Sequence, residues 1–230
     1  MKNCLSKIYV IHYTKLTERK KHMLTEINKW NLDALPIHFE EKYDQEVIVD
    51  FDVYQCINLE KFMQNTNREM KKGEMSLCLK YKSILEDISK LDDDEYVLVL
   101  EDDVIFKEDP LGYINRIVEK CDNENVLFDC IFMGEAALRV GDNRDVFYKK
   151  DYPATNGMCT VLYKVSSAKK LLQNLSFFKM ENALDWHFNN TFRDLNFNVY
   201  WGKAITEHGS VLAVHDSSRK GLKSSLRSRY

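Results

Sequence analysis

Short apolar runs alternate with longer amphipathic stretches along most of this chain. The clearest run is Tyr-Val-Leu-Val-Leu at 96–100, which is rich in β-branched residues and lies between polar segments. A run this short predicts a buried strand rather than a helix. Further strands are predicted at 7–13, 35–44 and 128–134, at the end of 156–163, and at 197–201.

Amphipathic stretches between these strands predict helices. They lie at 14–30, 73–91, 110–121, 166–175 and 183–195, and the segment 46–72 is expected to form loop and short helix. Thr14, Asp109 and Ser166 are candidate N-caps. Pro110 suits a first helical position, where no backbone donor is needed. Alternating strands and helices predict an α/β fold, with a mixed, mostly parallel central sheet flanked by helices in one domain over 1–230.

Three consecutive acids, Glu101, Asp102 and Asp103, follow the strand at 96–100 directly. Ligands of open α/β sheets bind in the crevice beyond the carboxyl ends of the strands. Carboxylates this close repel one another unless a positive charge joins them, and a divalent cation is the simplest candidate. The pattern therefore predicts a metal and phosphate site, with a solvated acidic turn as the alternative.

Arg19 lies on the first turns of the helix that follows the first predicted strand. A turn from strand to helix brings helix backbone N–H groups close to whatever occupies the crevice. Arg19 could therefore reach a phosphate or a base, and an ordinary surface arginine is the alternative.

The composition is that of a globular protein with no overall preference for nucleic acid. Of 230 residues, 44% are hydrophobic and 30% are charged, and the chain has only 8 Gly and 3 Pro. A net charge of -3 gives no argument for nucleic-acid binding. No apolar run approaches the roughly 20 residues needed to span a bilayer. No signal-peptide pattern is found either, so a cytoplasmic location is expected.

The six cysteines and the basic C-terminal tail narrow the function only slightly. No cysteines form a CxxC pair or lie near a histidine cluster, so neither a zinc site nor a disulfide framework is predicted. The tail at about 217–230 carries five basic residues and no acid. It is expected to be solvated, or else to contact an anionic membrane surface or the phosphates of a substrate.

Five segments, taken in order, point to a known family. They are YVIHYTKLTERKKHM at 9–23, GEMSLCLKYKSI at 73–84, VLVLEDDV at 97–104, FDCIFMG at 128–134 and NGMCTVLYKVSSAKKLL at 156–172. Together they resemble glycosyltransferase family 25, which includes lipooligosaccharide and procollagen galactosyltransferases. The resemblance spans nearly the whole chain. Gly-Glu followed at a helix's distance by Leu-Glu-Asp-Asp-Val is its most specific part.

The resemblance implies a GT-A-type, Rossmann-like fold and a divalent metal, Mn²⁺ or Mg²⁺. It implies that a hexose, with galactose as the first candidate, is transferred with inversion from a UDP-sugar. The acceptor would be a hydroxyl of a glycan or glycolipid such as lipooligosaccharide, or of a hydroxylysine-type protein acceptor.

Three features depart from the family pattern. Lys80 and Tyr81 stand where the family has Ser-His, and His12 stands where it usually has Asn after the first strand. The segment before His208 lacks the family's usual proline. The first departure puts the identity of the donor or of the acceptor in question more than it does the fold.

The acids and one histidine are the candidate metal site. Glu101 and Asp103 point to the same side of an extended chain, and their oxygens suit Mn²⁺ or Mg²⁺. Asp102 points the other way and could hydrogen-bond ribose or sugar hydroxyls. GT-A folds often add a C-terminal histidine ligand. His208 is favoured over His215 because it follows the last predicted strand, and a structural histidine is the alternative for either.

Other residues are expected to bind the donor or to act on the acceptor. His12 and Arg19 are expected on the donor side, and Arg219 and Lys220 of the basic tail could close over the diphosphate. Asp185, where the family has an Asp, is the expected general base, because the acceptor hydroxyl must lose its proton. The alternative is an ordinary acid favoured at a helix N-terminus.

Two other functions fit parts of the pattern. A receiver-like signalling domain also has acids at a strand end, but its acid pair follows the first strand and its chain is shorter. A non-catalytic nucleotide-sugar-binding or scaffold protein of a glycan-assembly complex fits better. The three acids together with Asp185 favour activity, whereas the departure at Lys80 and Tyr81 favours the non-catalytic alternative.

Overall fold

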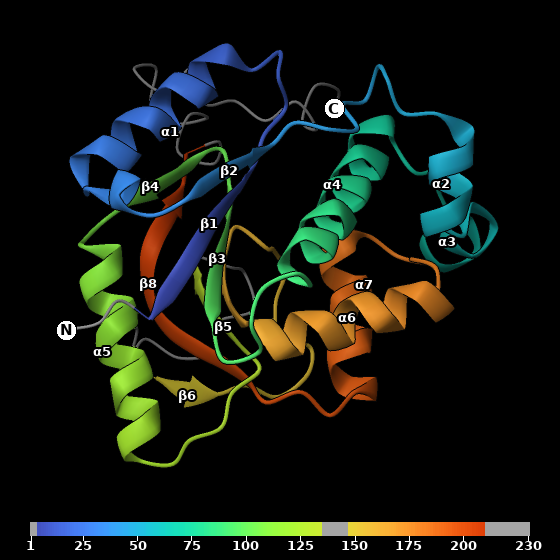
Figure 1. Ribbon diagram of the computed structural model, residues 1–230. Coiled ribbons are helices and arrows are strands. Elements are labelled where there is room, and N and C mark those ends of the chain that lie inside the picture. The colour runs from blue at the N-terminus through green and yellow to red at the C-terminus, as the bar shows by residue number, and fades with distance from the viewer. Residues whose placement is uncertain (1–3, 135–146, 210–230) are drawn as a thin grey trace.

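A central sheet is covered by helices on both sides in the computed structural model, which describes residues 4–134 and 147–209 (Figure 1). The strands are β1 (Leu5–Ile11), β2 (Ile37–Glu40), β3 (Tyr96–Glu101), β4 (Val104–Phe106), β5 (Cys130–Gly134), β6 (Tyr148–Lys149), β7 (Thr160–Lys164) and β8 (Val199–His208). The helices are α1 (Thr17–Lys29), α2 (Asp50–Cys56), α3 (Leu59–Thr66), α4 (Lys72–Ile88), α5 (Pro110–Asn123), α6 (Val165–Phe177) and α7 (Leu184–Asp194), and η1 (Leu32–Ala34) is a 3₁₀ turn. Among these described helices, none is both long enough and apolar enough to cross a membrane.

The sheet has eight strands in the order β2-β1-β3-β7-β5-β8-β4, and β6 pairs with β8 beside this path. β1 is parallel to β2 and β3, and β5 is parallel to β8. The other pairings, which involve β7, β4 and β6, are antiparallel. The predicted α/β class and the mixed sheet are confirmed. β1, β2, β3, β5 and β8 share one direction, whereas β7, β4 and β6 are antiparallel to the strands they pair with.

Each face of the sheet has its own apolar cluster. Along β3, Val97 and Val99 belong to the cluster that contains residues of α4, α6 and α7. Leu98 and Leu100 belong to the cluster that contains residues of α1 and α5. Successive side chains of a strand point to opposite faces, and all four of these side chains are buried. A strand covered on both faces shows a continuous apolar run, as 96–100 does.

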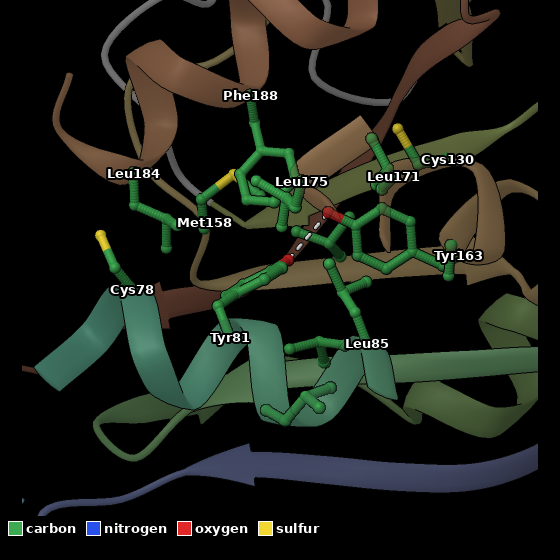
Figure 2. Packing of buried hydrophobic residues seen from close by; sticks show 14 of the residues in the cluster. Cys78, Tyr81, Leu85, Cys130, Met158, Tyr163, Leu171, Leu175, Leu184 and Phe188 are labelled. Atoms are coloured by element: carbon green, nitrogen blue, oxygen red, sulfur yellow. Dashed lines mark hydrogen bonds between the residues drawn. The ribbon is translucent and has the colours of Figure 1, made fainter. Parts of the chain in front are cut away.

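Two tyrosines tie α4 to the middle of the sheet (Figure 2). The hydroxyls of Tyr81 on α4 and Tyr163 on β7 are 2.8 Å apart and hydrogen-bond each other inside the core. Phe188 of α7 packs on Tyr81, with a distance of 5.2 Å between ring centroids. Buried hydroxyls need such partners, so the two tyrosines satisfy one another. Tyr81, one of the departures from the family pattern, is therefore a core residue.

Two of the three predicted N-caps are wrong. α1 begins three residues after Thr14, whose hydroxyl donates to Asp44 instead. α6 begins one residue before Ser166, because β7 runs straight into the helix. Asp109 does occupy the N-cap position of α5, with Pro110 as the first helical residue, although its side chain makes no capping hydrogen bond. The segment 46–72 contains α2 and α3, as expected of loop and short helix.

The last strand is longer than predicted, because β8 continues from the expected end at 201 to His208. Gly202 and Lys203 interrupt the apolar pattern at this point. A Cβ on Gly202 would lie only 2.8 Å from the hydroxyl of Tyr113, so α5 approaches the strand too closely for a larger residue. The extension pairs with β4 and brings His208 to the sheet edge where β3 ends.

Candidate active site

The link between β3 and β4 holds the acids. β3 ends at Glu101 and β4 begins at Val104, so Asp102 and Asp103 form the turn between them. β4 pairs antiparallel with the end of β8, which places His208 opposite Val104. The backbone N–H of Gly209 also donates to the carbonyl of Asp103 at 2.7 Å. The strand pairing therefore brings His208 beside the acids, far from them in sequence.

Glu101, Asp103 and His208, the predicted metal ligands, lie close together. One ligand atom from each lies within 4.8 Å of the other two, and His208 Nδ1 is 3.6 Å from Asp103 Oδ1. Asp103 is only 1% exposed, so the alternative of a solvated acidic turn is wrong. Two carboxylates and an imidazole at this spacing can hold a divalent cation such as Mn²⁺.

The charges of this cluster depend on one another. Burial and the neighbouring Asp103 and Asp102 raise the pKa of Glu101 to about 7, against the opposing effect of His208. Burial would lower the pKa of His208, but the neighbouring Asp103 carboxylate and the contact with Cys159 raise it to about 12. Protonated His208 thus supplies the positive charge that the acids require. A cation bound by all three residues would have to displace that proton.

Asp102 turns away from the cluster and into the protein. Its Oδ2 lies 2.8 Å from His12 Nδ1, and its Oδ1 accepts from Arg19 Nη1 at 2.5 Å. Arg19 Nη2 also lies 3.5 Å from Asp103 Oδ2. Arg19 is 7% exposed, so it is not the surface arginine of the alternative prediction. Both oxygens of Asp102 are thus engaged by protein groups, and Arg19 joins two of the acids.

A cavity of about 200 Å³ adjoins the acids. It is lined by Glu74, Leu77, Glu101, Gly157, Met158, Ala183, Leu184 and Asp185. A Cβ on Gly157 would lie 4.0 Å from His208 Nε2, so this histidine lies close behind the cavity wall. One cavity therefore joins the candidate metal cluster to the predicted base, Asp185.

Asp185 lies on the first turn of α7. Its Oδ1 accepts the backbone N–H of Trp186 at 2.9 Å. Burial raises the pKa of Asp185 above its ordinary value. A carboxylate with a raised pKa accepts a proton more readily, as a general base must.

Glu74 also lines this cavity, although no role was predicted for it. Its carboxylate accepts two hydrogen bonds from Arg68, at 2.7 and 2.6 Å, and one from the backbone N–H of Lys71 at 2.9 Å. A carboxylate that accepts two hydrogen bonds from one guanidinium group is held in one orientation. The Gly-Glu motif at 73–74 was the available signal, but without the fold nothing connected it to Asp185.

Three other candidates lie outside the described residues. These are His215 and the tail residues Arg219 and Lys220. Their expected roles stay predictions.

An α/β sheet with acids at a strand end beside a cavity can hold a cation and a substrate, and comparison with family models identifies the class as that of the glycosyltransferases. Within that class, the chain belongs to glycosyltransferase family 25, described as an LPS biosynthesis protein family, whose model matches residues 5–185. The family predicted from the five sequence segments is thereby confirmed. The search of curated proteins returned no matching sequence.

The sheet is also similar to that of solved glycosyltransferases. One is involved in the glycosylation of the major capsid of PBCV-1, with a TM-score of 0.50 at 13% identity, over 94% of this chain and 98% of that one. Another is mouse xyloside xylosyltransferase 1 in its apo form, with a TM-score of 0.34 at 11% identity, over 87% and 78% of the two chains. The first match shows a shared fold, and the second is too distant to support a conclusion.

A buried histidine near the base gives the fold a pH dependence. His187 of α7 is 7% exposed, and its Nε2 has no hydrogen-bond partner among the described residues. Burial lowers the pKa of His187 to about 4. The unfolded chain, with an ordinary pKa near 6.5, therefore binds the proton first as the pH falls.

We expect the folded state to lose stability between about pH 6.5 and pH 4 through His187, by about 2 kcal/mol at pH 5 relative to pH 7. The His187→Leu variant should lose that part of the dependence. The measurement is the free energy of unfolding in urea at both pH values, compared between the two proteins. Equal pH dependences would contradict the assignment, whatever the variant's stability at pH 7.

Proposed function

We propose that this glycosyltransferase is metal-dependent and inverting, and that it transfers a hexose, galactose first among the candidates, from a UDP-sugar to a glycan or glycolipid hydroxyl. The observation that carries the proposal is the convergence of Glu101, Asp103 and His208 beside a cavity that Asp185 also lines. A sugar leaving a diphosphate needs its leaving charge neutralised and the attacking hydroxyl deprotonated. The two sides of this site can meet those two needs.

Glu101, Asp103 and His208 would hold the cation on the donor side. When bound, Mn²⁺ or Mg²⁺ neutralises charge that develops on the departing diphosphate. Asp102, His12 and Arg19 belong to the donor side as well. Because their side chains are buried and bonded to one another, we assign them to the support of the strand end.

Asp185 would act on the acceptor side as the general base. An acceptor hydroxyl that enters the cavity meets a carboxylate whose burial favours taking up a proton. Inversion needs only one displacement, so a single base is enough. Glu74, fixed by Arg68, would accept a hydrogen bond from another acceptor hydroxyl.

The family description favours an acceptor of the lipopolysaccharide type over a hydroxylysine-type protein. Such an acceptor fits a cytoplasmic enzyme that contacts an anionic membrane through its basic tail at 217–230. Arg219 and Lys220 of that tail would then cover the diphosphate, as a closing segment that excludes water.

A non-catalytic UDP-sugar-binding protein is the second candidate, and the Lys80 and Tyr81 departures favour it. Incubation with a panel of UDP-sugars and Mn²⁺ separates the two functions. An enzyme should release UDP slowly even with water as the acceptor, and a chelator should stop the release. Binding of UDP-sugars without any release, even when glycan acceptors are added, would favour the second candidate.

Replacement of Asp103 by Ala should remove the metal-dependent part of nucleotide affinity, because a cation site of three protein ligands would lose its most buried one. Titration calorimetry with UDP, with and without Mn²⁺, measures this effect. Asp94→Ala, an exposed acid at the other end of β3, is the matched control and should bind as the wild type does. Unchanged affinity in Asp103→Ala, insensitive to chelator, would show that the metal site is misassigned.

Asp185→Asn should bind UDP and Mn²⁺ normally but turn over about 10²–10⁴-fold more slowly, because the amide cannot take the acceptor proton. Single-turnover transfer to acceptor gives the rate, and calorimetry gives the affinity. Asp194→Asn, an exposed acid at the other end of α7, serves as the control. Turnover near that of the wild type would exclude the base role.

A further inference from the structure

Lys80 is a buried lysine in the middle of α4, and it departs from the family pattern. The residue is 2% exposed. Its ammonium donates hydrogen bonds to the backbone carbonyl of His12 and to the carboxylate of Asp44. A buried ammonium is tolerated only with partners of this kind. Both partners lie close to the carboxyl ends of strands, His12 just after β1 and Asp44 after β2.

Besides its direct hydrogen bond to His12, Lys80 is connected to the loop after β1 through Asp44. Its Oδ2 accepts the backbone N–H of Thr14 at 3.2 Å and also the Thr14 hydroxyl. Asp44 is itself 7% exposed. Lys80 and Asp44 together therefore hold residues 12 and 14, in the first part of the connection between β1 and α1.

His12 carries this restraint to the acids. Its carbonyl accepts from Lys80, while Nδ1 of its ring lies 2.8 Å from Asp102 Oδ2. Asp102 in turn accepts from Arg19, which also reaches Asp103. A continuous series of polar contacts thus runs from α4 through the β1–α1 loop to the candidate metal cluster.

Lys80 does not line the cavity on the acceptor side. Two residues of the first turns of α4, Glu74 and Leu77, do line it, together with Asp185. A helix rises about 1.5 Å per residue, so Lys80 lies roughly 4–5 Å further along the axis than Leu77. The same helix therefore contributes to the cavity with its first turns and supports the β1–α1 loop with its middle.

We propose that Lys80 is a positioning residue of the donor side: it holds the β1–α1 loop and, through His12, the Asp102–Arg19 pair in the arrangement that binds the nucleotide. The inference rests on the proposed function. It means that Lys80, which departs from the family pattern, affects binding of the donor rather than binding of the acceptor.

The test compares Lys80→Met, which leaves the buried Asp44 carboxylate without its counter-charge, with the double variant Lys80→Met, Asp44→Asn, which removes both charges. The double variant should recover thermal stability relative to Lys80→Met. It should still bind UDP with Mn²⁺ about tenfold or more weakly than the wild type, because a displaced loop misplaces the donor contacts. Titration calorimetry gives the Kd, and hydrolysis of UDP-galactose by water should show the loss mainly in KM.

Two neighbours on α4 serve as controls. Tyr81→Phe removes a buried hydrogen bond without reaching the loop, and Lys82→Met removes a partly exposed charge paired with Glu86. Both should keep the UDP affinity of the wild type.

The possible outcomes separate the two proposals. If the wild type binds UDP with Mn²⁺ and the stable double variant binds it equally well, Lys80 is merely structural and the inference is overturned while the function stands. If the wild type binds no UDP, the proposed function fails and the inference fails with it. Weaker binding confined to the Lys80 variants supports the inference.

Discussion

Repulsion among three consecutive carboxylates at the end of a buried strand is the constraint on which this structure depends. Water cannot screen Asp102 and Asp103, because both are almost fully buried. The protein divides the charge instead. Asp102 is hydrogen-bonded to Arg19 and His12, while Glu101 and Asp103 lie beside His208, whose pKa is raised by these neighbours. Of the three acids, only Glu101 borders the cavity, and Glu101 and Asp103 together with His208 form the group that could hold a metal ion.

Much of the fold serves that division of charge. The pairing of β4 with the end of β8 places His208 beside the acids. Helix α1 contributes Arg19, which contacts Asp102 and Asp103. The buried Lys80–Asp44 pair anchors the loop that carries His12. Across the cavity, α7 contributes Asp185 and α4 contributes Glu74. The candidate metal cluster and the cavity that Glu74 and Asp185 line thus meet at Glu101.

Local patterns predicted what depends on local sequence. The apolar run 96–100, the acids after it, and the family motifs identified the buried strand, the metal candidates and the family. Features set by distant contacts were missed. The direction of β7 depends on which strands it pairs with, and the length of β8 depends on its pairing with β4. Thr14 does not cap α1 because its hydroxyl donates to Asp44, which is distant in sequence. The ion pairs of Asp102 with Arg19 and of Glu74 with Arg68 were not predicted for the same reason, because they form only in the folded chain.

The location of the cation is the most direct test of this account. Crystals of the full chain grown with Mn²⁺ and UDP allow the metal to be placed from its anomalous scattering. We expect one strong peak bounded by Glu101, Asp103 and His208, next to the diphosphate, with Asp102 still hydrogen-bonded to Arg19 and His12. Bound UDP with no peak at that position, or with Mn²⁺ held elsewhere, would contradict it.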